Sequence, residues 1–245
     1  MKRYLLFAAV SVVFFSSAVC SCAKSRDYEG RVIESESLEQ TYSEVADSSA
    51  YTSESSASDL SLAGSAVFFG TYNDSDIEWV VLEVNDNDEA LIISRNILNA
   101  LPYNDTGSEI TWEDSSIRSW LNNEFYNEAF TEEERSYIIS SCSLNLPNAQ
   151  YGISGGNNTM DNVFLLNIEE AQQYDFEALG VVNQVFYNTG ACYGWWLRSP
   201  GQSGQLASYV DRDGNVCPGG LSATGVMGIH PAIRVSNISE LIRTV

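Results

Sequence analysis

Three runs of apolar and β-branched residues open the part of the chain whose pattern predicts a folded domain. They are Ala66–Tyr72, Ile77–Val84 and Ala90–Ser94. Their content of valine, isoleucine and aromatic residues favours β-strands. The last two runs are separated by the acidic stretch Asn85–Glu89, which is typical of a turn. We therefore expect an antiparallel meander at the start of the domain.

A helical pattern follows the meander. Ile117, Trp120, Leu121 and Phe125 recur at spacings of three to four residues, which places them on one face of a helix. Aromatic residues at this spacing are more often core than ligand contacts, so we interpret the stripe as a buried helix face.

Two later segments carry the pattern of a capping box, which marks the first turn of a helix. They are Thr131 with Glu134 and Asn167 with Glu170. We expect the first of these helices to run through Ile139. The second is expected to run through Tyr174, directly after a strand-like segment at residues 163–166.

Two adjacent tryptophans dominate the next predicted strand, Trp195–Gly201. Successive side chains of a strand point to opposite faces, so Trp195 and Trp196 require partners on both faces. Two interpretations are open. The segment is a central core strand, with Arg198 held by a carboxylate or backbone carbonyls, or Arg198 and one indole form the floor of a ligand site.

The remaining pattern completes the fold prediction. Asp213 and Gly214, between apolar runs at residues 205–211 and 216–217, indicate a β-hairpin, and residues 228–235 form a closing strand. Long stretches without periodicity lie at residues 144–162 and 176–194. The pattern of two sets of strands with helices between them therefore predicts an α+β domain with long irregular loops.

The N-terminus has the pattern of a secretory signal. Lys2 and Arg3 precede an apolar run that is too short to span a membrane as a helix, and small residues follow. The segment Val19-Cys20-Ser21-Cys22 resembles the lipobox of a bacterial lipoprotein, with Cys22 as the lipidated residue. Residues 1–21 would then be the signal peptide. The alternative is an ordinary secreted protein that is cut nearby and keeps a free thiol.

Residues 22–65 combine this cysteine with a serine-rich, acidic segment that contains few large apolar groups. Such a segment cannot bury enough surface to offset its chain entropy, so we expect a disordered linker before a domain at residues 66–245. The protein would be an extracytoplasmic, membrane-anchored lipoprotein at the bacterial cell surface or envelope.

Charge restricts the partners of the domain. The chain has 33 acidic against 12 basic residues, and no lysine follows Ala66. Nucleic acids and anionic lipid headgroups need basic patches, so both are poor candidates as partners of the domain. Neutral or cationic partners remain, namely glycans, peptides, basic proteins or divalent cations.

Three cysteines fall in the domain, Cys142, Cys192 and Cys217. If two of them pair, we expect a disulfide between Cys192 and Cys217, which flank the tryptophan strand and the following hairpin. The alternative is that all three are buried as small apolar residues.

Few residues suit catalysis. The single histidine, His230, precedes a proline in the closing strand, and no nucleophile-elbow sequence is present. The cysteines lack the paired spacing of zinc ligands, so we expect neither a metal nor a cofactor. A hydrolase that uses paired carboxylates stays open, because the domain has many acidic residues.

Four segments, in this order, resemble recurring elements of a bacterial family of exported domains of unknown function. They are residues 112–122 (WEDSSIRSWLN), 161–166 (DNVFLL), 195–201 (WWLRSPG) and 228–233 (GIHPAI). The chain departs from that family at His230, where the pattern would place an arginine. The family is in turn similar to C-type-lectin-like domains of the formylglycine-generating (sulfatase-modifying) type. This resemblance implies a C-type-lectin-like fold, with a small twisted antiparallel sheet, two or three helices and long irregular loops. The formylglycine-generating reaction, however, uses two closely spaced cysteines, and Cys192 and Cys217 are far apart.

A binding module agrees best with these features. Candidate ligand-binding residues share amphipathic or hydrogen-bonding side chains on the tryptophan strand, its loop and the hairpin. They are Tyr193, Trp195, Arg198, Gln202, Gln205, Tyr209, Arg212 and Asn215. We expect a non-catalytic domain that recognises a glycan, peptide or protein. The alternative is a structural envelope lipoprotein without a small ligand.

Overall fold

The computed structural model describes residues 62–187 and 190–243, and for residues 184–187, 190–193 and 243 it describes the backbone only. The expected signal peptide, Cys22 and most of the expected linker lie outside these residues. Residues 62–65, which we assigned to the linker, pack on the domain: the Gly64 N–H donates to Val81 O, and the Val81 N–H donates to Ser65 O. None of the helices in the described part is both long and apolar enough to cross a membrane.

The predicted meander forms one side of the first sheet. Its strands are β1 (Ala66–Tyr72), β2 (Ser75–Val84), β3 (Ala90–Ser94) and β13 (Ala232–Val235). Their order is β1-β2-β3-β13, and each neighbouring pair is antiparallel. The meander of the first three strands is therefore confirmed, and the last strand of the chain completes the sheet.

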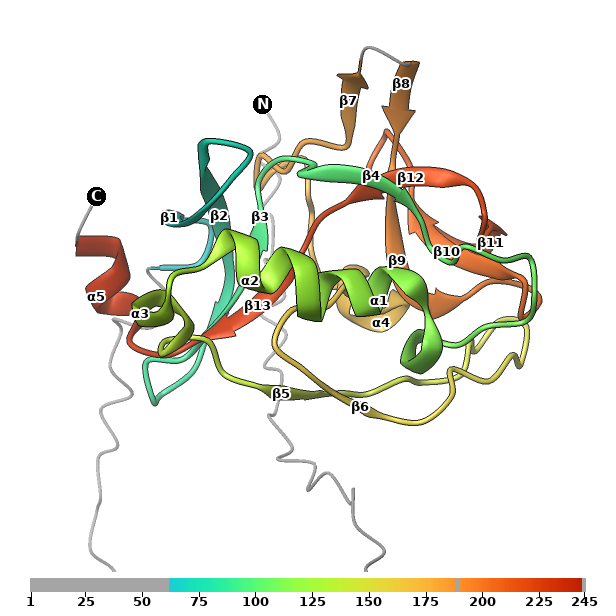
Figure 1. The fold of residues 1–245 in the computed structure, drawn as a ribbon, viewed down its shortest axis with the longest axis horizontal. Coiled ribbons are helices and arrows are strands. Elements are labelled where there is room, and N and C mark those ends of the chain that lie inside the picture. Colours follow the sequence, from blue (N-terminus) through green and yellow to red (C-terminus); the bar gives the residue numbers. More distant parts are fainter. Residues whose placement is uncertain (1–61, 188–189, 244–245) are drawn as a thin grey trace, which may run out of the picture. The chain divides into compact units, whose positions relative to one another are not determined.

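A second sheet contains the tryptophan strand at its centre (Figure 1). Its strands are β4 (Asn99–Pro102), β9 (Trp195–Pro200), β10 (Leu206–Val210), β11 (Val216–Ser222) and β12 (Val226–Ile229). Their order is β11-β10-β9-β12-β4. The predicted hairpin is the β10–β11 pair. The β9–β12 pair is parallel and the other pairs are antiparallel, so this sheet is mixed.

The two sheets share a ribbon of two strands. β3 leads into β4, and β12 leads into β13. β3 and β13 pair in the first sheet, whereas β4 and β12 pair in the second, so the two segments pass from one sheet to the other side by side. His230 and Pro231 occupy this junction. His230 Nδ1 lies 2.8 Å from Ser94 O, and the Ser94 N–H donates to Pro231 O. The predicted closing strand is thus split in two, because its halves belong to different sheets.

The helices are short and most of them follow β4. They are η2 (Trp112–Asp114), α1 (Ser116–Trp120), the π-helical η3 (Leu121–Phe125), α2 (Tyr126–Ala129), α3 (Glu132–Arg135), α4 (Ile168–Ala171) and α5 (Ile238–Arg243). Segments α1, η3 and α2 form one continuous rod, and its stripe residues Ile117, Leu121 and Phe125 are buried as predicted. Both capping boxes are confirmed.

The predicted ends of two helices and one predicted strand are wrong. The helix that starts after Thr131 ends at Arg135 because the Ile139 N–H donates to Arg234 O of β13. The helix after Asn167 ends at Ala171 instead of Tyr174. Residues 163–166 form only an isolated bridge between Phe164 and Ala232.

Two small antiparallel pairs complete the fold. They are β5 (Ser141–Ser143) with β6 (Thr159–Asp161), and β7 (Gln184–Tyr187) with β8 (Gly190–Tyr193).

The α+β class is confirmed, with more strands than helices and a curled sheet. Every residue of β9 is buried, as expected for a strand covered on both faces. Trp195 packs edge-on against Phe176 with ring centroids 5.1 Å apart, and Trp196 packs against Tyr103 at 5.9 Å. The core-strand interpretation of Trp195–Gly201 is the one that this burial supports.

Candidate functional site

Two of the predicted ligand-binding residues are in the core. Trp195 is 0% exposed and Arg198 is 2% exposed, so neither contacts a ligand at the surface. This corrects the prediction that Arg198 and one indole floor a ligand site. The physical reason is that both faces of β9 are covered, and a buried arginine needs a full set of partners from the protein itself.

The two terminal nitrogens of Arg198 have such partners, whereas its buried Nε has no hydrogen-bond partner among the described residues. Its Nη1 donates to Glu170 Oε2 at 2.6 Å and to Leu165 O at 2.6 Å, and its Nη2 donates to Glu170 Oε1 at 2.8 Å. Burial by itself would raise the pKa of Glu170, but the adjacent Arg198 guanidinium outweighs that effect and lowers this pKa. Arg198 therefore joins α4 to the tryptophan strand.

The exposed candidates do not form one site. Gln202 and Gln205 lie on the loop before β10, whereas Arg212 and Asn215 lie on the turn after it, at the opposite end of the strand. Tyr209 is partly exposed between these ends. The side chain of Tyr193 is outside the described part. The exposed candidates are therefore divided between two places: Gln202 and Gln205 share one loop, and Arg212 and Asn215 share the turn, with Tyr209 close to that turn.

The β10–β11 turn is held by its own hydrogen bonds. Asp211 Oδ1 accepts the N–H groups of Asp213 and Asn215, each at 2.9 Å. Burial would raise the pKa of Asp211, but these hydrogen bonds lower it. Among residues 62–187 and 190–243, no group of three His, Cys, Asp or Glu is arranged to hold a metal.

The cysteines differ from the prediction. Cys217 is a free thiol, so the expected disulfide with Cys192 is not formed. Burial raises the pKa of the Cys217 thiol, which keeps it protonated near neutral pH. Cys142 is disulfide-bonded, which also excludes the alternative that all three cysteines are buried free thiols.

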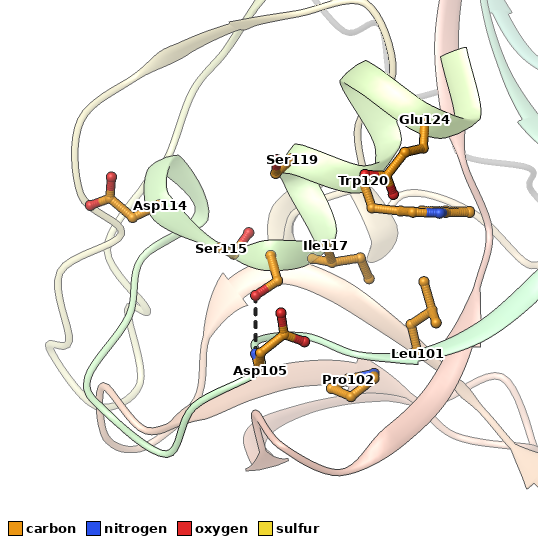
Figure 2. A pocket seen from close by; sticks show the side chains of 10 residues that line it. Leu101, Pro102, Asp105, Asp114, Ser115, Ile117, Ser119, Trp120 and Glu124 are labelled. Carbon is orange, nitrogen blue, oxygen red and sulfur yellow. Dashed lines mark hydrogen bonds between the residues drawn. The ribbon is translucent and has the colours of Figure 1, made fainter. Parts of the chain in front are cut away.

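A pocket of about 490 Å³ opens in a different place, between β4 and the helical rod (Figure 2). Its lining combines carboxylates, hydroxyls, an indole and aliphatic groups. The lining residues are Leu101, Pro102, Asp105, Asp114, Ser115, Ser116, Ile117, Ser119, Trp120 and Glu124. This volume is within the range of small-ligand sites.

Hydrogen bonds fix the strand side of the pocket to the start of α1. Ser116 Oγ donates to Asn104 Oδ1 at 2.9 Å and accepts the Asp105 N–H at 3.0 Å. The Ile117 N–H donates to Tyr103 O. These three hydrogen bonds hold the first turn of the rod against the segment that follows β4.

A buried carboxylate holds the rod from behind. Asp161 accepts Trp112 Nε1–H at 2.9 Å and Arg118 Nε–H at 2.7 Å, and also the Thr159 hydroxyl. Arg118 is therefore directed away from the pocket although it lies on α1. Trp112 and Arg118 of the 112–122 motif act in this support, whereas Asp114, Ser115, Ser116 and Ser119 of the same motif line the pocket.

Trp120 differs from the other tryptophans. Trp79, Trp112, Trp195 and Trp196 are buried, and each donates its indole N–H to an acceptor of the protein. Trp120 is partly exposed on the pocket wall, and within the described residues its indole N–H has no hydrogen-bond acceptor. Its ring rests edge-on against Tyr72 on the protein side. One edge of the indole is therefore available to a ligand.

A comparison with protein families assigns the chain to a family. The model of a family described as Domain of unknown function (DUF6273) matches residues 87–237, which is more than half of the chain. The chain belongs to the DUF6273 family. The expected domain of unknown function is thus confirmed. Neither curated proteins nor solved structures gave a match. The DUF6273 match runs from β3 to β13 and includes every residue of the pocket.

Sequence reasoning missed the pocket because Trp120 shares the helical spacing of the buried stripe. The usable signal was the composition of its neighbours. Asp114, Ser116, Ser119 and Glu124 surround a tryptophan on one rod, and such a polar surrounding is unusual for a buried indole.

Proposed function

We propose that the DUF6273 domain is a non-catalytic recognition module, and that the pocket between β4 and the helical rod is its ligand site. The pocket itself carries the proposal. It combines an accessible indole with several hydrogen-bonding groups, and its rear is fixed by the Asp161 network. A preorganised concave surface lowers the entropic cost of binding a ligand.

The expected cellular setting supports a recognition role. With Cys22 lipidated, the acidic segment before residue 66 would hold the domain away from the membrane and display it to extracytoplasmic glycans, peptides or proteins. The similarity to C-type-lectin-like domains, inferred from the four motifs, is in keeping with recognition. We propose that this α+β domain has a C-type-lectin-like fold.

A direct test uses the purified full chain on an array of neutral, acidic and basic glycans and peptides. The variant Trp120→Phe keeps an aromatic ring against Tyr72 but removes the indole edge. We expect it to weaken capture by about tenfold, in line with the loss of roughly 1.4 kcal/mol from one aromatic contact. Arg212→Ala, on the same array, tests whether the β10–β11 hairpin is the ligand site instead.

The outcomes separate the alternatives. Capture that depends on Arg212 and not on Trp120 would move the site to the hairpin. A well-folded chain that captures nothing would contradict a ligand-binding role and favour the structural lipoprotein. Turnover of an array glycan that is lost in both Asp105→Asn and Glu124→Gln would instead favour a carboxylate-dependent hydrolase.

A further inference from the structure

Resting on the proposed function, we infer that the pocket binds a basic side chain of a peptide, with the cationic group between Asp105 and Glu124 and beside the Trp120 ring. All of these residues line the pocket; in the view of Figure 2, the Glu124 carboxylate lies beside Trp120, the Asp105 carboxylate points toward Ile117, and Asp114 turns away.

The three carboxylates of the pocket, Asp105, Asp114 and Glu124, are exposed, and none of them is paired with a basic side chain in the described part of the chain. Arg118, the arginine of the same helix, donates to Asp161 and to Glu113 O instead. A cationic group in the pocket would therefore find its counter-ions unengaged.

Water exclusion decides between a neutral and a cationic ligand. A neutral ligand that fills the pocket removes water from around the carboxylates, and their desolvation and mutual repulsion then cost more because the local dielectric constant falls. A cation offsets both costs with its own charge. An anionic ligand adds to them.

The rest of the lining matches a basic side chain in shape. Leu101, Pro102 and Ile117 provide aliphatic contacts for its methylene stem. The accessible ring of Trp120 is the preferred aromatic partner of a guanidinium or ammonium group. Leu101, Ile117 and Trp120 line the same pocket, so the stem and the cation would enter together.

The test compares isosteric peptides on the full chain. Short capped peptides in a glycine and serine frame carry one central arginine or lysine, and their neutral partners carry citrulline or norleucine. Binding is followed by NMR on the indole N–H signals, with the Trp120 signal assigned by its loss in Trp120→Phe. We expect at least tenfold weaker binding of the neutral peptides, and weaker binding of the basic ones as salt rises.

Matched variants locate the effect. Glu124→Gln and Asp105→Asn should each weaken binding of the basic peptides by about fivefold or more, a change on the scale of one charge-assisted contact. Glu128→Gln is the control, because Glu128 lies one turn further along the rod, is exposed and does not line the pocket. It should change binding by less than about twofold. Thermal unfolding of each variant checks that the domain is folded.

The results distinguish this inference from the proposed function. Equal affinity for arginine and citrulline peptides, or equal losses in Glu124→Gln and Glu128→Gln, would overturn the cationic ligand. If a neutral glycan or peptide moves the Trp120 signal and the basic peptides do not, the pocket remains a recognition site and only the inference fails. If no probe moves that signal, both fail.

Discussion

His230 is the single histidine of the chain, and it is fully buried where the ribbon passes between the two sheets. Nε2 lies 2.9 Å from Val182 O, and Nδ1 faces Ser94 O. These carbonyls favour the protonated ring, but burial outweighs them and lowers the pKa of His230 to about 4. The folded protein therefore keeps this ring neutral in mildly acidic solution.

The lowered pKa of His230 in the folded protein predicts that stability depends on pH. In the unfolded chain the pKa of a histidine is about 6.5, so between about pH 6.5 and 4 the unfolded state binds a proton that the folded state does not. The free energy of unfolding should fall as the pH falls through this window, by up to about 3 kcal/mol from His230 alone. Urea unfolding at several pH values measures it.

His230→Gln isolates this contribution, because the carboxylates that also titrate there are common to both proteins. The variant should be less stable than the wild type at pH 7, and the gap should narrow toward pH 4. If the free energies of unfolding of the two proteins change in parallel between pH 6.5 and 4, His230 is protonated in the folded protein over that range.

At the scale of elements, two capping boxes of the same sequence type have different surroundings. Thr131 caps α3 at the surface, where its hydroxyl accepts the Glu134 N–H. Asn167 caps α4 in the interior, and the Glu170 of its capping box also pairs with Arg198. The second cap therefore positions a carboxylate on which a buried cation depends.

We expect Thr131→Ala to lower the free energy of unfolding by about 1 kcal/mol, the usual value of a helix cap. Asn167→Ala should cost at least about 2 kcal/mol, since Glu170 loses the group that orients it toward buried Arg198. Chemical denaturation of both variants gives the comparison. Similar losses in the two proteins would show that Glu170 is oriented without its cap.

These elements also show how far the sequence could predict the fold. Strands β1 and β3 were found to the residue because their β-branched runs end at turn residues. The helix after Thr131 was predicted too long because its end depends on a hydrogen bond to β13, about a hundred residues later. Distant contacts of this kind leave no local pattern.

The candidate site was harder to predict than the fold. Trp195 and Arg198 stood out in sequence, but their prominence reflects burial and a network with Glu170. Trp120 looked like a member of the core stripe, and its exposure depends on how the rod meets β4. Spacing along one helix cannot reveal which of its faces a separate strand leaves open.

At the scale of the whole molecule, the strong negative charge and the expected lipid anchor determine the environment of the domain. The predicted anchor is testable through the cysteine pair. Cys22→Ala should move the protein from the membrane fraction to the soluble fraction and abolish incorporation of a labelled fatty acid, because a soluble domain without an acyl chain has little membrane affinity.

Cys20→Ala is the matched control for the anchor, since it removes a thiol two residues away from the same segment. This variant should stay in the membrane fraction and keep the label. If both variants remain at the membrane, the attachment does not use Cys22. If the wild type is itself unlabelled and soluble, the chain is an ordinary secreted protein.

The ribbon shared by the two sheets also constrains the order of folding. β3 pairs with β13, and β4 pairs with β12. Strands from the first part of the domain therefore pair with strands near its C-terminal end. Neither sheet can be completed until the polypeptide is present to about Val235. Pairing over so long a separation slows folding. A chain that emerges from its N-terminus would stay open during most of its synthesis, which is the state that passage through an export channel requires.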